Sequence, residues 1–239
     1  MSRALGDGTL IGGPNKPGFG GRGAFVFGES LEPELAALPL WLRAADVVID
    51  VGANSGVYAL RAARIVGPEG LVIALEPSVE MLSVLQRNVR RNGYENVRLR
   101  GIGAGDSITA LPLYENNSAP NSFSVVHQAE MAASSSILIV TLDALVNWEN
   151  LTHVDFIKID AEGFERQVLT GASDLIARFQ PALLMESSGN SSKSLAVPPG
   201  YRVFVPAAGK QRKELWLPAA HRLSPGMAGA GWANVRGDT

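Results

Sequence analysis

The stretch DVVIDVGANSG, residues Asp46–Gly56, decides how this chain is expected to fold. Apolar, β-branched residues lead into Asp50, a turn with glycines at both ends follows, and the helical-looking segment VYALRAARIV comes next. This order predicts a buried strand, a sharp turn and a helix N-terminus. Such a unit directs backbone N–H groups and a helix dipole at a ligand beside the end of the strand. We therefore expect the ligand site here.

Length and composition predict a globular α/β protein. The 239 residues allow one large domain, and 46% apolar residues suffice for a substantial core. The formal net charge of −2 gives no reason to expect a nucleic-acid partner. The absence of cysteine excludes disulfides, thiolate metal sites and cysteine nucleophiles. Without a long apolar run or an apolar signal region, we expect a cytoplasmic protein with no membrane partner.

The rest of the chain alternates between strand and helix patterns. Helices are expected over Ser55–Val66 and Val79–Asn92, with strands at Leu71–Leu75 and Val97–Ile102. This alternation favours right-handed parallel crossovers and an open α/β sheet. Later candidates are the strands Val154–Ile159, Pro181–Met185, Tyr201–Val205 and Glu214–Leu217, and a helix over Phe164–Phe179 that Gly171 can break.

Three segments depart from this alternation. Residues 1–23 hold many glycines and no apolar period, which predicts a flexible N-terminal arm. Residues 224–239 are rich in Gly and Ala and predict a flexible tail, so the folded domain is expected over 24–223. Residues 107–140 predict a small β-ribbon inserted before the fourth strand, and such excursions commonly shape specificity.

The glycine turn discriminates among nucleotide cofactors. Its G-x-x-x-G spacing lacks the third glycine of a dinucleotide motif and the lysine of a P-loop. Asp50, two residues before the first glycine, favours a ligand with a cationic end over a pyrophosphate. Glu76 ends the second strand and suits a ribose diol, and Asp106 follows the third and suits an adenine amino group. Together these features describe S-adenosylmethionine (SAM).

Further blocks of sequence carry a family resemblance over about residues 25–222. The chain resembles the FkbM family of class I SAM-dependent methyltransferases in DVGANSG at 50–56, EP at 76–77, TLDAL at 141–145, IKIDAEGFE at 157–165 followed by VLTGA, and PALLME at 181–186. The resemblance implies a Rossmann-like, mostly parallel sheet of seven strands with the last antiparallel. It also implies a methyltransferase domain over 24–223, usually directed at a hydroxyl of a natural product or sugar.

The predicted cofactor half of the site surrounds the opening turn. Gly52 and Gly56 are also explained by a tight turn in any α/β protein, but Glu76 and Asp106 favour the SAM interpretation. The residues expected to bind SAM are Asp50, Gly52, Ala53, Asn54, Gly56, Glu76, Pro77, Gly105 and Asp106.

The predicted catalytic half lies around the end of the fourth strand. Lys158 and Asp160 share a face of that strand, and Asp160 emerges at the edge where open α/β sheets bind ligands. An alcohol is a poor acid, so a carboxylate alone is a weak base for it. Either His127 takes the proton, or Mg²⁺ held by Asp160, Glu162 and Glu186 lowers the pKa of the acceptor.

Several alternatives stay open at this stage. Glu162 is explained equally well by a helix start, where acidic residues are favourable, and His127 by an ordinary solvated loop. We expect a SAM-dependent O-methyltransferase in natural-product biosynthesis or glycan modification, with a small-molecule acceptor. The alternatives are an N- or carboxyl-methyltransferase, an enzyme dependent on NAD or a nucleotide sugar, and a SAM-binding protein without activity. A homodimer is compatible with the sequence.

Overall fold

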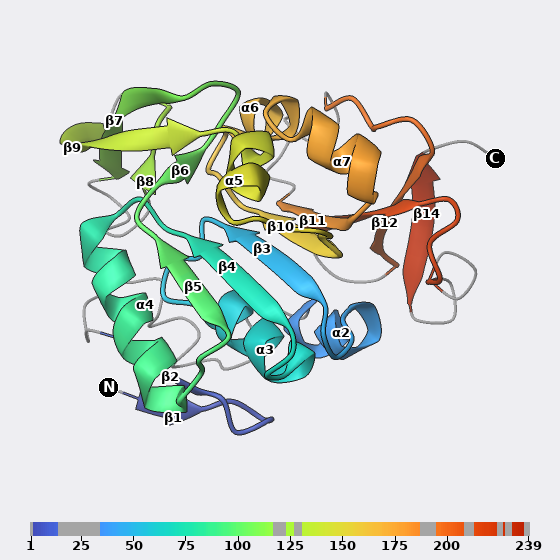
Figure 1. Cartoon of the computed structure of the whole chain (residues 1–239), viewed down its shortest axis with the longest axis horizontal. Coiled ribbons are helices and arrows are strands. Elements are labelled where there is room, and N and C mark those ends of the chain that lie inside the picture. Colours follow the sequence, from blue (N-terminus) through green and yellow to red (C-terminus); the bar gives the residue numbers. More distant parts are fainter. Residues whose placement is uncertain are drawn as a thin grey trace.

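The central feature of the fold is a mostly parallel sheet with helices on both faces (Figure 1). The computed structural model describes residues 2–13, 34–116, 123–126, 131–186, 195–207, 213–223, 227 and 231–236. In spatial order, the strands of the sheet are β14 (Trp232–Arg236), β12 (Tyr201–Pro206), β13 (Lys213–Pro218), β11 (Ala182–Glu186), β10 (Phe156–Ile159), β3 (Val47–Val51), β4 (Leu71–Leu75) and β5 (Val97–Arg100).

Strand directions follow from the pairing. The neighbours from β11 through β10, β3 and β4 to β5 are all parallel. β13 runs antiparallel to β11 and to β12, and β14 runs antiparallel to β12. All five strands from β11 to β5 therefore end at one edge of the sheet, where their last residues can share a ligand.

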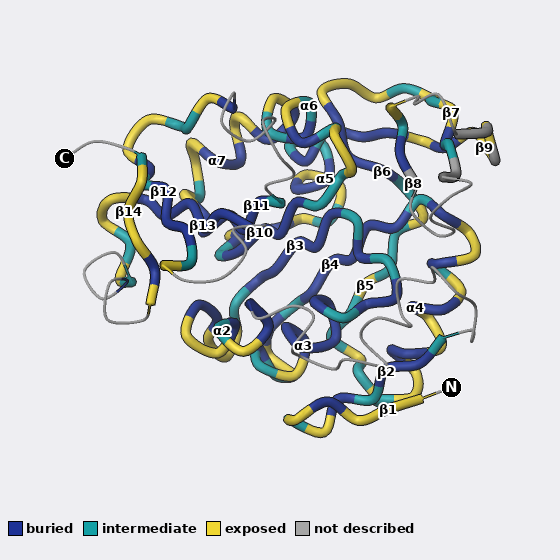
Figure 2. The backbone as a smooth tube through the Cα atoms, turned by 180° about the vertical axis from the view of Figure 1, so that it is seen from behind, coloured by how far each residue is buried: buried dark blue, intermediate teal, exposed yellow. Residues whose placement is uncertain are grey.

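Two apolar clusters fill the space between the sheet and its helices. Alternation along β3 places Val48 in one cluster and its neighbours Val47 and Ile49 in the other. The first face carries α2 (Glu34–Trp41), α3 (Val57–Val66) and α4 (Val79–Asn92), and the second carries α5 (Leu142–Trp148), α6 (Glu165–Thr170) and α7 (Ser173–Phe179). The buried core accordingly follows the sheet through the middle of the molecule (Figure 2).

The described sheet has eight strands, whereas the family resemblance implies seven. The additional edge strand, β14, lies within the segment 224–239 that the sequence predicts as a flexible tail. Trp232 at its start is buried and meets the ring of Trp41 edge-on, with the centroids 5.2 Å apart. This contact joins residues distant in the sequence, so the Gly/Ala-rich composition around Trp232 gave no local sign of it.

The N-terminal hairpin, formed by β1 (Ser2–Ala4) and β2 (Leu10–Gly12), is a second departure. The sequence predicts a flexible arm over residues 1–23, but Ile11 is fully buried and packs with Leu5 against Val57 of α3. Two apolar residues in a glycine-rich segment form no hydrophobic periodicity, so the local sequence does not indicate their burial. Their burial depends on packing against α3. Residues 14–23 of the predicted arm lie outside the described residues.

The chain leaves the central sheet between β5 and β10 and forms the ribbon sheet (Figure 1). Its order is β6-β9-β7-β8, and β7 and β9 make a long antiparallel pair. The sequence predicts a ribbon here. The apolar run within its last strand begins only at Ile137, because the preceding Ala and Ser residues show no apolar alternation. The strands are β6 (Gly103–Ala104), β7 (Thr109–Asn116), β8 (Phe123–Ser124) and β9 (Met131–Val140).

Gly171 separates α6 from α7 within the predicted helix Phe164–Phe179. A Cβ atom on Gly171 would overlap the carbonyl oxygen of Gly105, which follows β6. The backbone N–H of Asp143 also donates to the carbonyl of Gly171 at 3.0 Å. The break therefore lets α6 and α7 approach the start of the ribbon sheet closely.

We expect Gly171→Ala to lower the free energy of unfolding by about 1–3 kcal/mol, the usual cost of forcing extra atoms into a packed contact. Urea denaturation of both proteins measures this difference. Gly101→Ala is the matched control, because a Cβ there meets only the end of the Leu82 side chain, at 3.0 Å. Equal stabilities for Gly171→Ala and wild type would contradict the close approach.

Candidate active site

The glycine turn, residues 52–56, connects β3 to α3 at the carboxyl edge of the sheet. The backbone N–H groups of Gly52 and Ala53 donate to the carbonyl oxygen of Leu75 at 3.1 and 2.9 Å, which ties the turn to β4. Gly52 has a φ of 73°, and a Cβ on it would overlap the carbonyl oxygen of Asp160. Glycine at this position therefore allows the turn to meet the end of β10.

Glu76 holds the glycine turn from the side of β4. Its Oε2 accepts a hydrogen bond from the backbone N–H of Asn54 at 2.7 Å, and its Oε1 accepts one from Ser78 at 2.8 Å. Burial raises the pKa of Glu76 to about 7, although both N–H groups act in the opposite direction. The carboxyl group is thus 4% exposed, held in place and turned toward a pocket.

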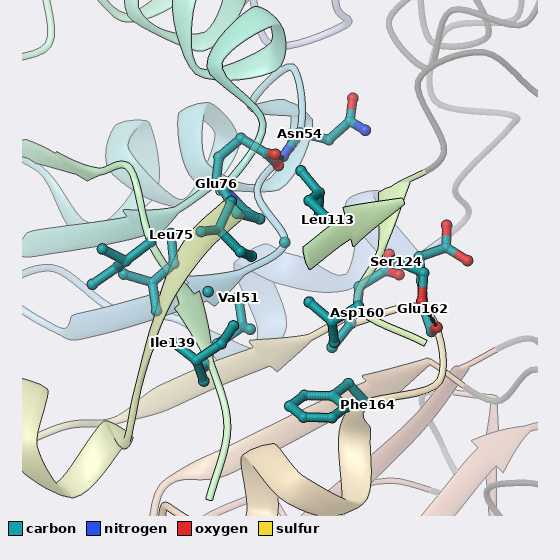
Figure 3. Close-up of a pocket in the computed structure, with 18 residues that line it drawn as sticks. Val51, Asn54, Leu75, Glu76, Leu113, Ser124, Ile139, Asp160, Glu162 and Phe164 are labelled. Carbon is teal, nitrogen blue, oxygen red and sulfur yellow. Dashed lines mark hydrogen bonds between the residues drawn. The ribbon is translucent and has the colours of Figure 1, made fainter. Parts of the chain in front are cut away.

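This pocket lies between the glycine turn and the ribbon sheet and encloses about 730 Å³, part of it open to solvent. Glu76 and Asn54 lie on one side, with Asp160 and Glu162 on the other (Figure 3). Apolar side chains from the ribbon sheet and α6 complete the walls. These are Leu113, Val125, Ile137, Ile139 and Phe164.

Asp160 belongs to a cluster of buried charges on the face of the sheet that α3 covers. Lys158 Nζ lies 3.2 Å from Asp50 Oδ1 and 3.5 Å from Asp160 Oδ2. Lys213 Nζ, from β13, lies 3.6 Å from the same Asp160 oxygen. The two ammonium groups stand 5.4 and 4.9 Å from the ring centroid of Tyr58 in α3, within the range of cation–π attraction.

The protonation states of Asp160 and Glu186 are linked. Burial raises the pKa of Asp160, but Lys158, a hydrogen bond from Glu186 and Lys213 outweigh it and hold the pKa well below its usual range. Burial and the neighbouring Asp160 raise the pKa of Glu186 to about 9. Near neutral pH, Glu186 therefore carries a proton that it shares with Asp160, and Asp160 presents a negative charge to the pocket. Burial also raises the pKa of Asp50, and Lys158 opposes this.

The Mg²⁺ site predicted from Asp160, Glu162 and Glu186 is not supported. Asp160 is paired with two lysines and a protonated carboxyl group, which is a poor environment for a dication. Glu162 sits on an exposed turn with a φ of 48°. Within the described part of the chain, no three His, Cys, Asp or Glu side chains are grouped so that they could hold a metal ion.

The structure places the predicted site residues in four groups. Asp50, Ala53 and Gly56 support the pocket without lining it. Asp106 is exposed and accepts a hydrogen bond from Ser107 at 3.1 Å, while Gly105 is buried against Phe164, so Ile102–Ala104 line the wall where adenine contacts were predicted. His127 lies outside the described residues. The predicted residues that line the pocket are Gly52, Asn54, Glu76, Pro77, Asp160 and Glu162.

Lys213 and Tyr58 are site residues that sequence reasoning missed. Lys213 meets Asp160 because β13 lies beside β11 in space, and no sequence spacing shows this. A weak signal existed, since Lys213, Leu215 and Leu217 alternate along one buried face of a strand. A lysine on such a face has to find a carboxylate partner.

A scan against family models gives one match that covers most of the chain. The Methyltransferase FkbM domain model matches residues 50–211. Methyltransferase 1 of Beauveria bassiana is 28% identical over 146 residues, covering 53% of this chain and 58% of that protein. Protein-L-isoaspartate O-methyltransferase 1 of Archaeoglobus fulgidus is 39% identical over 56 residues, 23% of this chain and 26% of that protein. The matches thus span 58% and 26% of the lengths of these two curated relatives.

Two solved structures have a similar fold. An FkbM methyltransferase from Methylobacillus flagellatus KT gives a TM-score of 0.54 at 19% identity, over 74% of this chain and 44% of that one. A putative methyltransferase, yhhF, from Escherichia coli gives 0.51 at 14% identity, over 92% and 100%. These likenesses support the α/β methyltransferase fold. In the described part of the chain, no helix is long and apolar enough to cross a membrane.

Glu76 gives the site a testable pH dependence. We expect the ionised carboxylate to accept the ribose hydroxyls of SAM, and a pKa near 7 leaves most of it protonated at pH 6. Binding should therefore weaken by up to about tenfold between pH 8 and pH 6. Calorimetry with SAM measures this, and Glu76→Gln should bind weakly with no such slope. The same slope in both proteins would remove Glu76 as its source.

Proposed function

The chain belongs to the FkbM methyltransferase family, and we propose that it transfers the methyl group of SAM to a hydroxyl oxygen of a small polar molecule such as a natural product or sugar. The observation that carries the proposal is the carboxyl group of Asp160, which lines the pocket opposite Glu76 and Asn54 and lies beside the ammonium groups of two lysines. Its charge state decides which acceptor groups the pocket favours.

The pocket fits a nucleoside cofactor with a polar tail. Glu76 can accept hydrogen bonds from the hydroxyl groups of a ribose, and the apolar side chains of Ile102 and Ile139 can pack against a planar base. SAM, when bound, supplies a methyl group already activated as a sulfonium. The residues of this chain then need only to align the acceptor oxygen and provide for its proton.

Asp160 distinguishes three kinds of acceptor by charge. A neutral hydroxyl can donate a hydrogen bond to the carboxylate and turn a lone pair toward the methyl group. An amine beside the same carboxylate is stabilised in its protonated form, which has no lone pair for attack. A carboxylate acceptor would meet like charge. An ionised Asp160 therefore favours oxygen methylation at a hydroxyl over amine or carboxylate methylation.

The charge cluster keeps Asp160 oriented for this role. Lys158 and Lys213 both contact its Oδ2, and the hydrogen bond from Glu186 restrains the carboxylate further. Because these lysines hold the pKa low, Asp160 is a better hydrogen-bond acceptor than base. His127 remains our proposed base for the departing proton.

A matched panel of acceptors tests the proposal. Each scaffold is offered to the enzyme and SAM in three forms, as an alcohol, a primary amine and a carboxylic acid. We expect methylation of the alcohols, with S-adenosylhomocysteine formed in equal amount and the new methyl placed on oxygen by NMR. Methylation of the amines or acids, with the alcohols unchanged, would overturn the oxygen assignment.

We expect Asp160→Asn to lower kcat by about 10²-fold, the usual cost of misplacing a reacting group. SAM affinity should stay within about twofold, since Glu76 and the glycine turn are unchanged, a difference near 0.4 kcal/mol. Steady-state rates on a methylated alcohol and calorimetry with SAM separate the two effects. Glu162→Gln, on the same side of the pocket but exposed, is the matched control. Wild-type turnover in Asp160→Asn would remove Asp160 from the reaction.

Lys213→Met should shift the acid limb of the pH profile of kcat, measured at saturating SAM so that Glu76 does not limit the rate, to higher pH. Losing the ammonium at 3.6 Å removes a charge that favours the ionised form of Asp160, so its pKa must rise. Lys213→Arg keeps the positive charge and should restore the wild-type profile. An acid limb that does not move in Lys213→Met would show that Lys213 has no influence on Asp160.

A further inference from the structure

The side chain of Asn88, in the middle of α4, connects the N-terminal hairpin to the glycine turn. Its Nδ2 donates to the carbonyl oxygens of Gly12 and Ser55, both at 2.9 Å. Its Oδ1 accepts from the backbone N–H of Gly12 at 3.0 Å. The side chain is 1% exposed, and both amide hydrogens and the oxygen are in use.

Asn92, one helical turn later, makes similar contacts to the hairpin and also donates from its Nδ2 to the carbonyl oxygen of Asn88 at 2.8 Å. Its Nδ2 donates to the carbonyl of Leu10 at 2.7 Å, and its Oδ1 accepts from the N–H of Leu10 at 2.7 Å. The i, i+4 spacing puts both side-chain amides on one face of α4, where they hydrogen-bond to backbone N–H and C=O groups of β2. The two residues thus differ in their second donor contact, which goes from Asn88 to the glycine turn and from Asn92 to the backbone of α4.

The hairpin also contacts the helix that the glycine turn begins. Asp7 forms an ion pair with Arg61 of α3 at 3.0 Å, and both side chains are largely buried. Ile11 and Leu5 pack against Val57 in the first turn of the same helix. The hairpin, seen at the lower end of α4 in Figure 1, therefore rests on the back of the predicted cofactor site.

The glycine turn is held between two fixed points. In front, Glu76 binds the N–H of Asn54 from the side of the pocket. Behind, Asn88 binds the carbonyl of Ser55, the next residue along the chain. A shift of the hairpin or of α4 relative to α3 would strain the second contact and move the N–H groups that the first contact aligns.

We propose that Asn88 is a positioning residue that couples docking of the N-terminal hairpin to SAM binding. The range matched by the family model, residues 50–211, includes Asn88 but not the hairpin that it contacts. The proposal rests on SAM as the cofactor, as proposed above, but not on the chemistry of the acceptor. Because coupling between two sites is reciprocal, bound SAM must also stabilise the docked hairpin.

A pair of variants tests the coupling through binding. Asn88→Leu and Asn92→Leu both remove amide contacts to the hairpin and should both lower the melting temperature. We expect Asn88→Leu to weaken SAM binding by at least about fivefold, the lower end of usual coupling strengths, and Asn92→Leu by less than about twofold. Equal SAM affinities for the two variants would overturn the proposal. Should Asn88→Leu fail to fold, Asn88→Asp keeps the acceptor for Gly12 and removes both donors.

Hydrogen exchange on the wild-type chain gives a readout that a purely structural role would not change. With saturating SAM, amides of residues 10–12 should exchange at least about fivefold more slowly than without it. Asn88→Asp should lose this added protection. An unchanged exchange rate in the wild type would overturn the coupling. Failure of the wild type to bind SAM at all would instead remove the cofactor on which the coupling depends.

Discussion

The backbone of the glycine turn lies against the end of β10, and the remainder of the site depends on this contact. A Cβ on Gly52 would overlap the carbonyl oxygen of Asp160, so the two segments meet with no side chain between them. Lys158 reinforces the contact by donating to the carbonyl of Gly52 at 2.7 Å while it faces Asp160. The residues proposed to hold the cofactor and the residue proposed to hold the acceptor therefore face the same pocket from opposite sides.

Close contact between these segments requires charges to be buried together. An isolated buried carboxylate or ammonium is costly, and the cluster meets this constraint by pairing. Lys158 forms ion pairs with Asp50 and Asp160, Lys213 forms one with Asp160, and Glu186 carries a proton. The pocket consequently faces one oriented carboxylate with a defined charge. Removing one partner of such a group is expected to alter the protonation of the others, since their titrations are coupled.

The order of strands and helices was predictable because it depends on local patterns. Apolar runs, turn residues and caps such as Ser78, whose side chain accepts from Met81, are all short-range signals. Trp232, Ile11 and Lys213 escaped prediction because each is buried by residues far away in the chain. Gly171 shows the intermediate case, since a break was predictable at a glycine but its cause, the carbonyl of Gly105, was not.

The amino-acid sequence by itself indicated the family, and it predicted SAM as the cofactor and the carboxyl edge of the sheet as the place of the site. It could do so because glycine spacing and the residues that end parallel strands act over a few positions. Only the tertiary structure decided that Asp106 faces solvent, that Asp160 is paired with two lysines, and that Asn88 connects the hairpin to the glycine turn. Those outcomes depend on which distant strands and helices become neighbours, and packing of the whole chain determines that.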